Sequence, residues 1–194
     1  MRAQSLTRPA GEKDRAAVAL CIAKSFDKDF SFFCKDSKRV SAAIAPGLDI
    51  NSFFVAETES VLSGTFAISN GGARAARAVF GALIKNFGLM KGFFAWLVLK
   101  NEFERPAPCP EETGYIEFVA VDPNFRRRGI AKDMLRRGME HSGRKSFMLD
   151  VIDTNFAAIE CYKSLGFVKT GRVPEKHPKQ AGFNAKIYMS LTAK

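Results

Sequence analysis

The spacing of hydrophobic positions in the N-terminal part of the chain predicts a strand, two helices and a hairpin. Val18, Cys21 and Ile22 recur at helical spacing, so the segment at 12–25 is interpreted as the first helix. The other elements expected here are a strand at 6–8, a helix at 32–45 and a hairpin at 51–69.

The stretch from 73 to 105 has a pattern of its own. Apolar residues recur at helical spacing on both sides of Gly88, and the charged side chains among them are mostly basic. Two basic amphipathic helices are the expected structure. The longest apolar run, at 93–99, is too short to span a bilayer, which takes about 20 residues. No transmembrane segment is therefore expected.

Strands and helices alternate in the C-terminal half. The expected strands lie at 114–121, 146–152, 167–173 and 185–191, and the expected helices lie at 129–141 and 156–165. A chain of 194 residues fits one domain, since domains of roughly 100–200 residues are typical. We therefore expect a single domain over 1–194.

Composition and charge limit the class of protein. The chain is 46% hydrophobic and 26% charged, which is typical of a globular protein and not of a disordered one. Its formal net charge of +10 favours a polyanionic partner: nucleic acid, an anionic membrane or a phosphate-rich cofactor. A basic surface without any such partner would also explain the charge.

The four cysteines, Cys21, Cys34, Cys109 and Cys161, give no sign of a metal site or of disulfides. They form no CxxC pair and have no histidine cluster beside them, so zinc spacing is absent. Residues 1–12 lack the apolar run of a signal peptide. A cytoplasmic protein with reduced cysteines is the simplest interpretation.

The segment at 115–131 combines a strand, a tight turn, a basic loop and the beginning of a helix. A loop that leads into a helix exposes backbone N–H groups without partners, and the helix dipole adds partial positive charge there. Arg126, Arg127 and Arg128 add more, and Gly129 lets the backbone approach a ligand. A diphosphate suits such a loop, although the pattern is neither a Walker loop nor a GxGxxG fingerprint.

Two blocks of sequence resemble the GNAT N-acetyltransferase superfamily. Arg126-Arg127-Arg128-Gly129-Ile130-Ala131 is similar to the family signature R/Q-x-x-G-x-G/A, with Val121-Asp122-Pro123 as the usual lead-in. The second block has Asn155, Ala157, Ala158, Tyr162 and Gly166-Phe167 in the order typical of the family. The resemblance covers about 114–170, and Ala131 stands in place of the commoner second glycine.

The resemblance implies an α/β (α+β) fold with a mixed, mostly antiparallel central sheet flanked by helices. The segment at about 73–105 is then a helical insertion between the third and fourth strands. Acetyl-CoA is implied as the co-substrate, without a metal, in a cleft where the fourth and fifth strands part. The residues expected to bind the cofactor are Val119, Ala120, Val121, Arg126, Arg127, Arg128, Gly129, Ile130, Ala131, Asn155 and Tyr162. Asn155 is also a candidate N-cap for the helix that begins at Phe156.

The resemblance also implies catalytic residues. Tyr162 matches the family's tyrosine and is the candidate acid that protonates the sulfur of CoA. Glu117 is the candidate base, acting through a water, and alternation puts it on the same face as Val119 and Val121. The alternative for Glu117 is a pairing with a surface arginine. Asp150, on the adjacent strand, is a rival base or a residue that caps a turn.

The expected activity is transfer of an acetyl group from acetyl-CoA to a primary amine, by direct attack in a ternary complex. The bulky insertion favours an enclosed pocket and hence a small-molecule acceptor, with a protein lysine or N-terminus as the alternative. The apolar insertion also suits a homodimer interface.

An alternative of another class is a protein that binds an anionic membrane surface, with Phe87, Phe93, Phe94 and Trp96 at the interface. Nucleic-acid binding is a weaker alternative and is not the expected function, because no stacking aromatic residues are interleaved with the arginine triplet.

Overall fold

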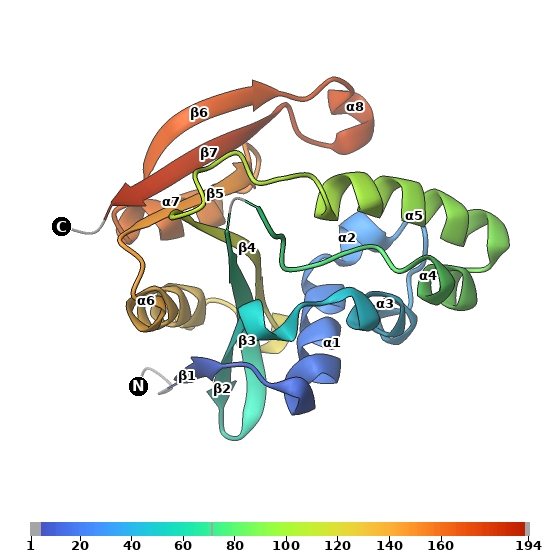
Figure 1. Ribbon diagram of the computed structural model, residues 1–194, viewed down its shortest axis with the longest axis horizontal. Coiled ribbons are helices and arrows are strands. Elements are labelled where there is room, and N and C mark those ends of the chain that lie inside the picture. Colours follow the sequence, from blue (N-terminus) through green and yellow to red (C-terminus); the bar gives the residue numbers. More distant parts are fainter. Residues whose placement is uncertain (1–4, 71, 193–194) are drawn as a thin grey trace.

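Seven strands form one sheet in the computed structural model, which describes residues 5–70 and 72–192 (Figure 1). The strand order is β1-β2-β3-β4-β5-β7-β6, and every neighbouring pair is antiparallel except β4 and β5. The strands are β1 Leu6–Pro9, β2 Phe53–Thr58, β3 Val61–Ser69, β4 Gly114–Val121, β5 Ser146–Ile152, β6 Val168–Pro174 and β7 Ala185–Thr192. The mixed, mostly antiparallel sheet expected from the sequence is confirmed.

Helices cover both faces of this sheet (Figure 1). They are α1 Arg15–Ser25, α2 Asp27–Phe30, α3 Ser37–Ile44, α4 Phe80–Phe87, α5 Leu89–Phe103, α6 Ile130–Ser142, α7 Phe156–Ser164 and α8 Pro178–Ala181. In the described part of the chain, no helix is both long enough and apolar enough to cross a membrane.

The prediction of a helix over 32–45 is wrong about where the helix begins. Asp36 is the N-cap of α3, and its carboxylate accepts a hydrogen bond from the Lys38 N–H at 2.8 Å. An aspartate in this position satisfies N–H groups of the first turn and so fixes where the helix begins. Residues 31–36 instead form the connection from α2.

Each face of the sheet has its own apolar core. On one face α1, α3, α4 and α5 pack against Phe53 and Ala67 and form what we call the α1-side core. On the other face α6 and α7 pack against Phe66 and Leu149 and form the α6-side core. Gly138 of α6 allows close packing there, because a Cβ at this position would lie 2.3 Å from the ring of Phe66. The close approach holds α6, and with it the loop that precedes α6, against the sheet.

The insertion between β3 and β4 consists of two packed helices, α4 and α5, as the sequence predicts. Gly88 separates them with a φ of 84°, and its N–H donates a hydrogen bond to the Ile84 carbonyl at 2.9 Å. Gly92 lies against α4, since a Cβ there would come within 2.7 Å of the Ile84 Cα. Leu83 and Leu99 anchor the pair in the α1-side core.

Candidate active site

The parallel strands β4 and β5 pair only at their beginnings. Pairing joins 114–116 to 147–149, after which β4 continues to Val121 and β5 to Ile152 with no further pairing between them. The strands therefore part at the place where the sequence predicts the cofactor. An open strand edge offers backbone groups to an extended ligand, as it would to an added strand.

A bulge in β4 changes the face that Glu117 occupies. The register against β3 shifts beside Ala67, and Phe118 has a positive φ of 54°. Ala67, which lies opposite Glu117, belongs to the α1-side core, as does Phe118, whereas Val119 and Val121 pack on the α6 side. The expectation that Glu117 shares a face with Val119 and Val121 is therefore wrong, because a bulge breaks strict alternation.

Asp122 anchors the loop that follows β4. Its carboxylate accepts hydrogen bonds from the Asn124 N–H at 3.0 Å and from Lys24 Nζ, on α1, at 2.8 Å. Burial alone would raise the pKa of this carboxyl, but the hydrogen bonds from Lys24 and Asn124 outweigh it and lower the pKa. The ionised carboxylate therefore ties the loop to α1.

Two arginines brace the same loop. Arg126 Nε donates to the Val121 carbonyl at 3.2 Å, and Arg128 Nη2 donates to the Asn124 carbonyl at 3.2 Å. The Arg128 guanidinium also lies over the Phe125 ring, 5.4 Å from its centroid. All three arginines of the loop remain exposed, so their charge is available to an anion.

The loop ends at Gly129, the N-cap of α6. Its φ of 81° is in the left-handed region. A Cβ there would meet no atom within 4 Å, so glycine is needed here for its backbone conformation and not because a side chain would clash. The first helical hydrogen bond runs from the Asp133 N–H to the Gly129 carbonyl at 3.1 Å. The earlier N–H groups, those of Ile130 and Ala131 among them, have no partner within the helix. Together with the helix dipole and the arginines, they form a site suited to a diphosphate.

Tyr162, on α7, lies in the α6-side core, with its ring centroid 6.1 Å from that of Phe167. The side chain is buried, and burial raises the pKa of its phenol, with smaller effects from Cys161 and Asp150. No hydrogen bond of its hydroxyl is found among the described residues, and the side chain is only 6% exposed. The raised pKa keeps the phenol protonated at neutral pH.

Asn155 caps α7. Its Oδ1 accepts a hydrogen bond from the Ala158 N–H at 3.2 Å, and the side chain is exposed. The capping interpretation is therefore observed, while contact with a cofactor stays a prediction.

Glu117 is enclosed by hydrogen-bond donors. Arg74 approaches one oxygen with Nη2 at 2.7 Å and Nε at 2.9 Å, and the Ala75 N–H donates to the other at 3.0 Å. The Ser69 hydroxyl also donates to that second oxygen. The pairing with an arginine that the sequence left open is thus present, and the carboxylate is only 6% exposed.

Asp150 lies beside Glu117 on the neighbouring strand and is more open. One of its oxygens accepts a hydrogen bond from the Tyr115 hydroxyl, and the other is 3.9 Å from Lys186 Nζ. Its side chain is 26% exposed. Lys186, on β7, also donates to Glu102 Oε1 of α5 at 2.6 Å. This contact joins the insertion to the part of the sheet beyond β5.

Sequence reasoning does not identify Arg74, Tyr115, Lys186 or Glu102 as residues of this region. Tyr115 carries one usable signal: it stands two residues before Glu117 on the same strand, so alternation places the two on one face. The contacts of Arg74 and Glu102 depend on how the insertion folds back, which no spacing in the sequence encodes.

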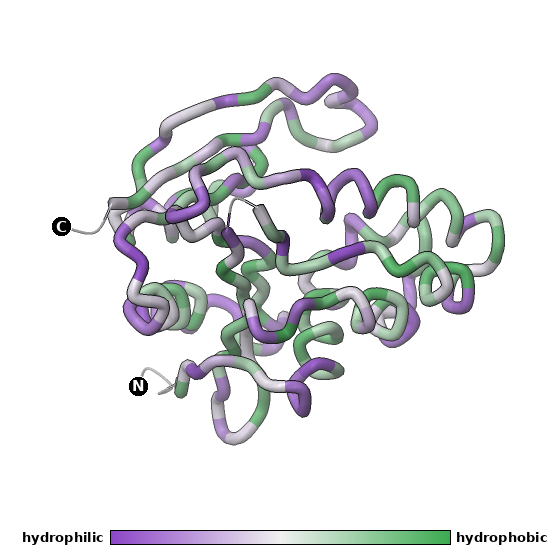
Figure 2. The backbone as a smooth tube through the Cα atoms, viewed as in Figure 1, coloured by the Kyte–Doolittle hydropathy of each residue, from purple (hydrophilic) through white to green (hydrophobic). Residues whose placement is uncertain are grey.

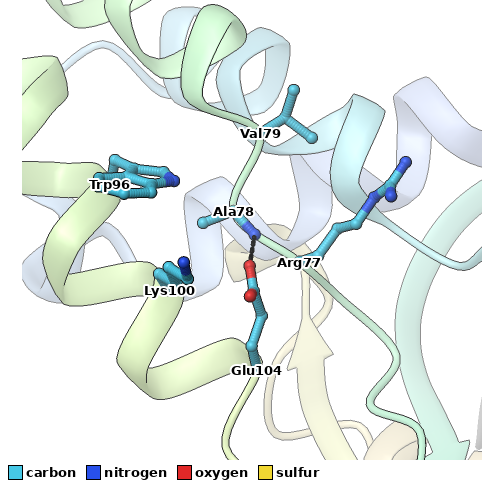
Figure 3. Close-up of a pocket in the computed structure, with 6 residues that line it drawn as sticks. All are labelled: Arg77, Ala78, Val79, Trp96, Lys100 and Glu104. Atoms are coloured by element: carbon cyan, nitrogen blue, oxygen red, sulfur yellow. Dashed lines mark hydrogen bonds between the residues drawn. The ribbon is translucent and has the colours of Figure 1, made fainter.

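A pocket of about 580 Å³ lies against the insertion and not at the β4–β5 opening. Arg77, Ala78, Val79, Trp96, Lys100 and Glu104 line it (Figure 3). The Ala78 N–H donates to the Glu104 carboxylate at 3.2 Å, while the Arg77 side chain points away from Trp96 (Figure 3). We assign the candidate active site to the β4–β5 opening, because the arginine-rich loop, Tyr162 and Asp150 converge there. Within the described residues, no group of three or more His, Cys, Asp or Glu is placed to hold a metal ion.

The fold and the loop define a protein of the acyltransferase class. The model of the acetyltransferase (GNAT) family matches residues 47–167, and the chain belongs to this family. The resemblance drawn from the two sequence blocks is therefore confirmed.

Known proteins agree with this assignment. The [ribosomal protein bS18]-alanine N-acetyltransferase of Salmonella typhimurium is 36% identical over 76 residues, which are 38% of this chain and 51% of that protein. The mycothiol acetyltransferase of Thermobifida fusca is 35% identical over 75 residues, 34% of this chain and 23% of that protein. The match thus spans about half the length of the first relative and less of the second.

Solved structures share the fold. An N-acetyltransferase from Staphylococcus aureus Mu50 superposes with a TM-score of 0.63 at 18% identity, over 96% of this chain and all of that one (100%). A Salmonella typhimurium protein solved with its cofactor acetyl-CoA gives a TM-score of 0.59 at 17% identity, over 98% of this chain and 94% of that one.

Proposed function

We propose that this protein transfers an acetyl group from acetyl-CoA to a primary amine by direct attack in a ternary complex. The observation that carries the proposal is the opening between β4 and β5, which lies beside an arginine-rich loop at the N-terminus of α6. The diphosphate of CoA would bind to the N–H groups from Gly129 to Ala131 and to Arg126, Arg127 and Arg128. The pantetheine arm would run along Val119, Ala120 and Val121, with Asn155 beside it.

Tyr162 acts as the acid in this proposal. The amine nitrogen attacks the thioester carbonyl, the new C–N bond forms, the C–S bond breaks, and the departing sulfur takes the phenolic proton. Its raised pKa supports the role, because the phenol keeps its proton until the thiolate develops.

Asp150 is the base that the geometry favours over Glu117. Glu117 already accepts hydrogen bonds from Arg74, Ala75 and Ser69, so neither oxygen is left for a water. Asp150 keeps one oxygen on the open side, where it can accept the amine proton directly or through a water. We assign Glu117 to positioning Arg74 and the end of the insertion.

A small amine is the proposed acceptor. The contact between Glu102 of α5 and Lys186 of β7 brings the insertion toward Asp150, the proposed base, and so supports an enclosed acceptor pocket. The second candidate is a protein N-terminus, which the relatives that acetylate ribosomal protein bS18 favour. A cytoplasmic location is proposed from the four cysteines, all of which are free.

Calorimetry with acetyl-CoA, followed by a thiol-release assay over a panel of small amines and N-terminal peptides, tests the proposal. We expect saturable binding of acetyl-CoA and amine-dependent release of CoA thiol. Folded protein that gives no heat with millimolar acetyl-CoA would refute it.

A further inference from the structure

The α4–α5 insertion presents an apolar surface on the side turned away from the domain. Gly92, Ala95, Leu99 and Phe103 make up the face of α5 that is buried. On the outer side Met90 is 80% exposed and Phe94 is 60% exposed. The exposed large apolar residues of this surface, which we call the outer stripe, are Leu89, Met90, Phe93, Phe94, Leu97 and Val98. A contiguous exposed apolar patch marks an interaction site more often than free surface, so the outer stripe indicates a partner outside the chain.

The outer stripe differs from the membrane-facing set expected from the sequence. Phe93 and Phe94 belong to it, but Phe87 is buried in the α1-side core. Trp96 is half-buried, with its ring against Phe80 and Phe93 and with Lys100 Nζ 4.9 Å from its centroid. The inclusion of Phe87 is therefore wrong, whereas Trp96 lies at the edge of the outer stripe and is partly exposed. Figure 2 shows the end of the α4–α5 insertion, where the two helices join, as largely hydrophobic and at the edge of the molecule.

The charged side chains interspersed with the outer stripe are basic. The sequence holds no Asp or Glu between Glu59 and Glu102, while Lys85, Lys91 and Lys100 are exposed on the α4–α5 insertion. Glu102, near the C-terminal end of α5, pairs with Lys186. With about 100° of rotation per helical residue, Lys91 and Lys100 lie on opposite flanks of the outer stripe. This arrangement is typical of a helix that lies in the plane of a membrane surface, with apolar side chains below the headgroups and lysines beside the lipid phosphates.

We infer that the α4–α5 insertion docks this protein on a membrane surface rich in anionic phospholipid. A second copy of the chain fits less well, because a two-fold contact through the outer stripe would bring the lysines of one copy toward those of the other. The helix lies on the bilayer and does not cross it: its 15 residues reach about 22 Å, against the roughly 30 Å of a hydrocarbon core. This inference is independent of the proposed acetyl transfer.

Flotation of the full chain with vesicles tests the inference. We expect binding to phosphatidylcholine vesicles that contain phosphatidylglycerol, weak binding to phosphatidylcholine alone, and a decline of binding as salt rises. Phe94→Glu combined with Leu97→Glu should lower binding by about tenfold or more. The matched control combines Val168→Glu and Val173→Glu, two exposed positions on β6, and should bind as the parent does.

A second pair of substitutions separates loss of membrane binding from loss of folding. Lys85→Gln with Lys91→Gln keeps the outer stripe and should weaken binding to the phosphatidylglycerol vesicles, while circular dichroism shows an unchanged unfolding midpoint. Three outcomes overturn the inference: no binding of the parent to these vesicles, equal losses in the β6 control pair, or a lipid-free dimer that the Phe94 and Leu97 substitutions dissociate in analytical ultracentrifugation.

Discussion

Glu117 and Asp150 occupy the first positions at which β4 and β5 no longer pair, one on each side of the opening. The last paired residues are Ile116 and Leu149, whose side chains both lie in the α6-side core. The next residue of each strand therefore turns to the opposite face. The two candidate bases are neighbours there. They differ in how many hydrogen bonds from the protein their carboxylate oxygens already accept.

We expect Asp150→Asn to lower turnover by about a hundredfold or more, the range of a lost general base, with little change in acetyl-CoA affinity. Glu117→Gln should raise the KM for the amine more than it lowers kcat, because Glu117 positions its surroundings. Steady-state kinetics with saturating acetyl-CoA separates the two effects. Full turnover in Asp150→Asn would remove Asp150 as the base and return the role to Glu117.

The Arg74–Glu117 pair makes a separate prediction about stability. Its members are only 15% and 6% exposed, so removing one leaves a charge with little solvent. We expect Glu117→Gln to cost about 2–4 kcal/mol of unfolding free energy in urea titration. The double variant Arg74→Gln with Glu117→Gln is the control and should recover part of that loss. Additive losses in the double variant would show that the two side chains are not coupled.

Tyr162→Phe should lower kcat by about a hundredfold and leave acetyl-CoA affinity largely intact, because only the proton donor is lost. Burial raises the pKa of Tyr162 above the ordinary value of 10.0, and loss of the proton abolishes the acid. The alkaline decline due to this residue therefore lies above the pH at which a free tyrosine titrates. A pH–rate profile of the parent tests the sign: a Tyr162-dependent decline centred well below pH 10, at about 8, would contradict it.

The sequence indicates β4, β5 and the loop between β4 and α6 correctly, because each depends on local signals. The stretch at 115–121 is rich in β-branched and aromatic residues, and Gly129 stands where the chain needs a positive φ. The face of Glu117 is not predictable in this way, because a bulge at the non-glycine residue Phe118 interrupts the alternation. Arg74 and Glu102 join the site only through long-range packing of the insertion, which sequence spacing does not carry.

The last prediction concerns Gly129, where two substitutions separate backbone strain from ligand binding. Gly129→Ala meets no atom within 4 Å, so its cost is that of a left-handed φ, about 1–2 kcal/mol of stability. Gly129→Glu has the same backbone strain and also places a carboxylate among the N–H groups that we assign to the CoA diphosphate. Calorimetry should therefore show acetyl-CoA binding retained in the alanine variant, weakened by less than about tenfold, and abolished in the glutamate variant. If the glutamate variant binds acetyl-CoA as the alanine variant does, the diphosphate is held elsewhere and the assignment of this loop fails.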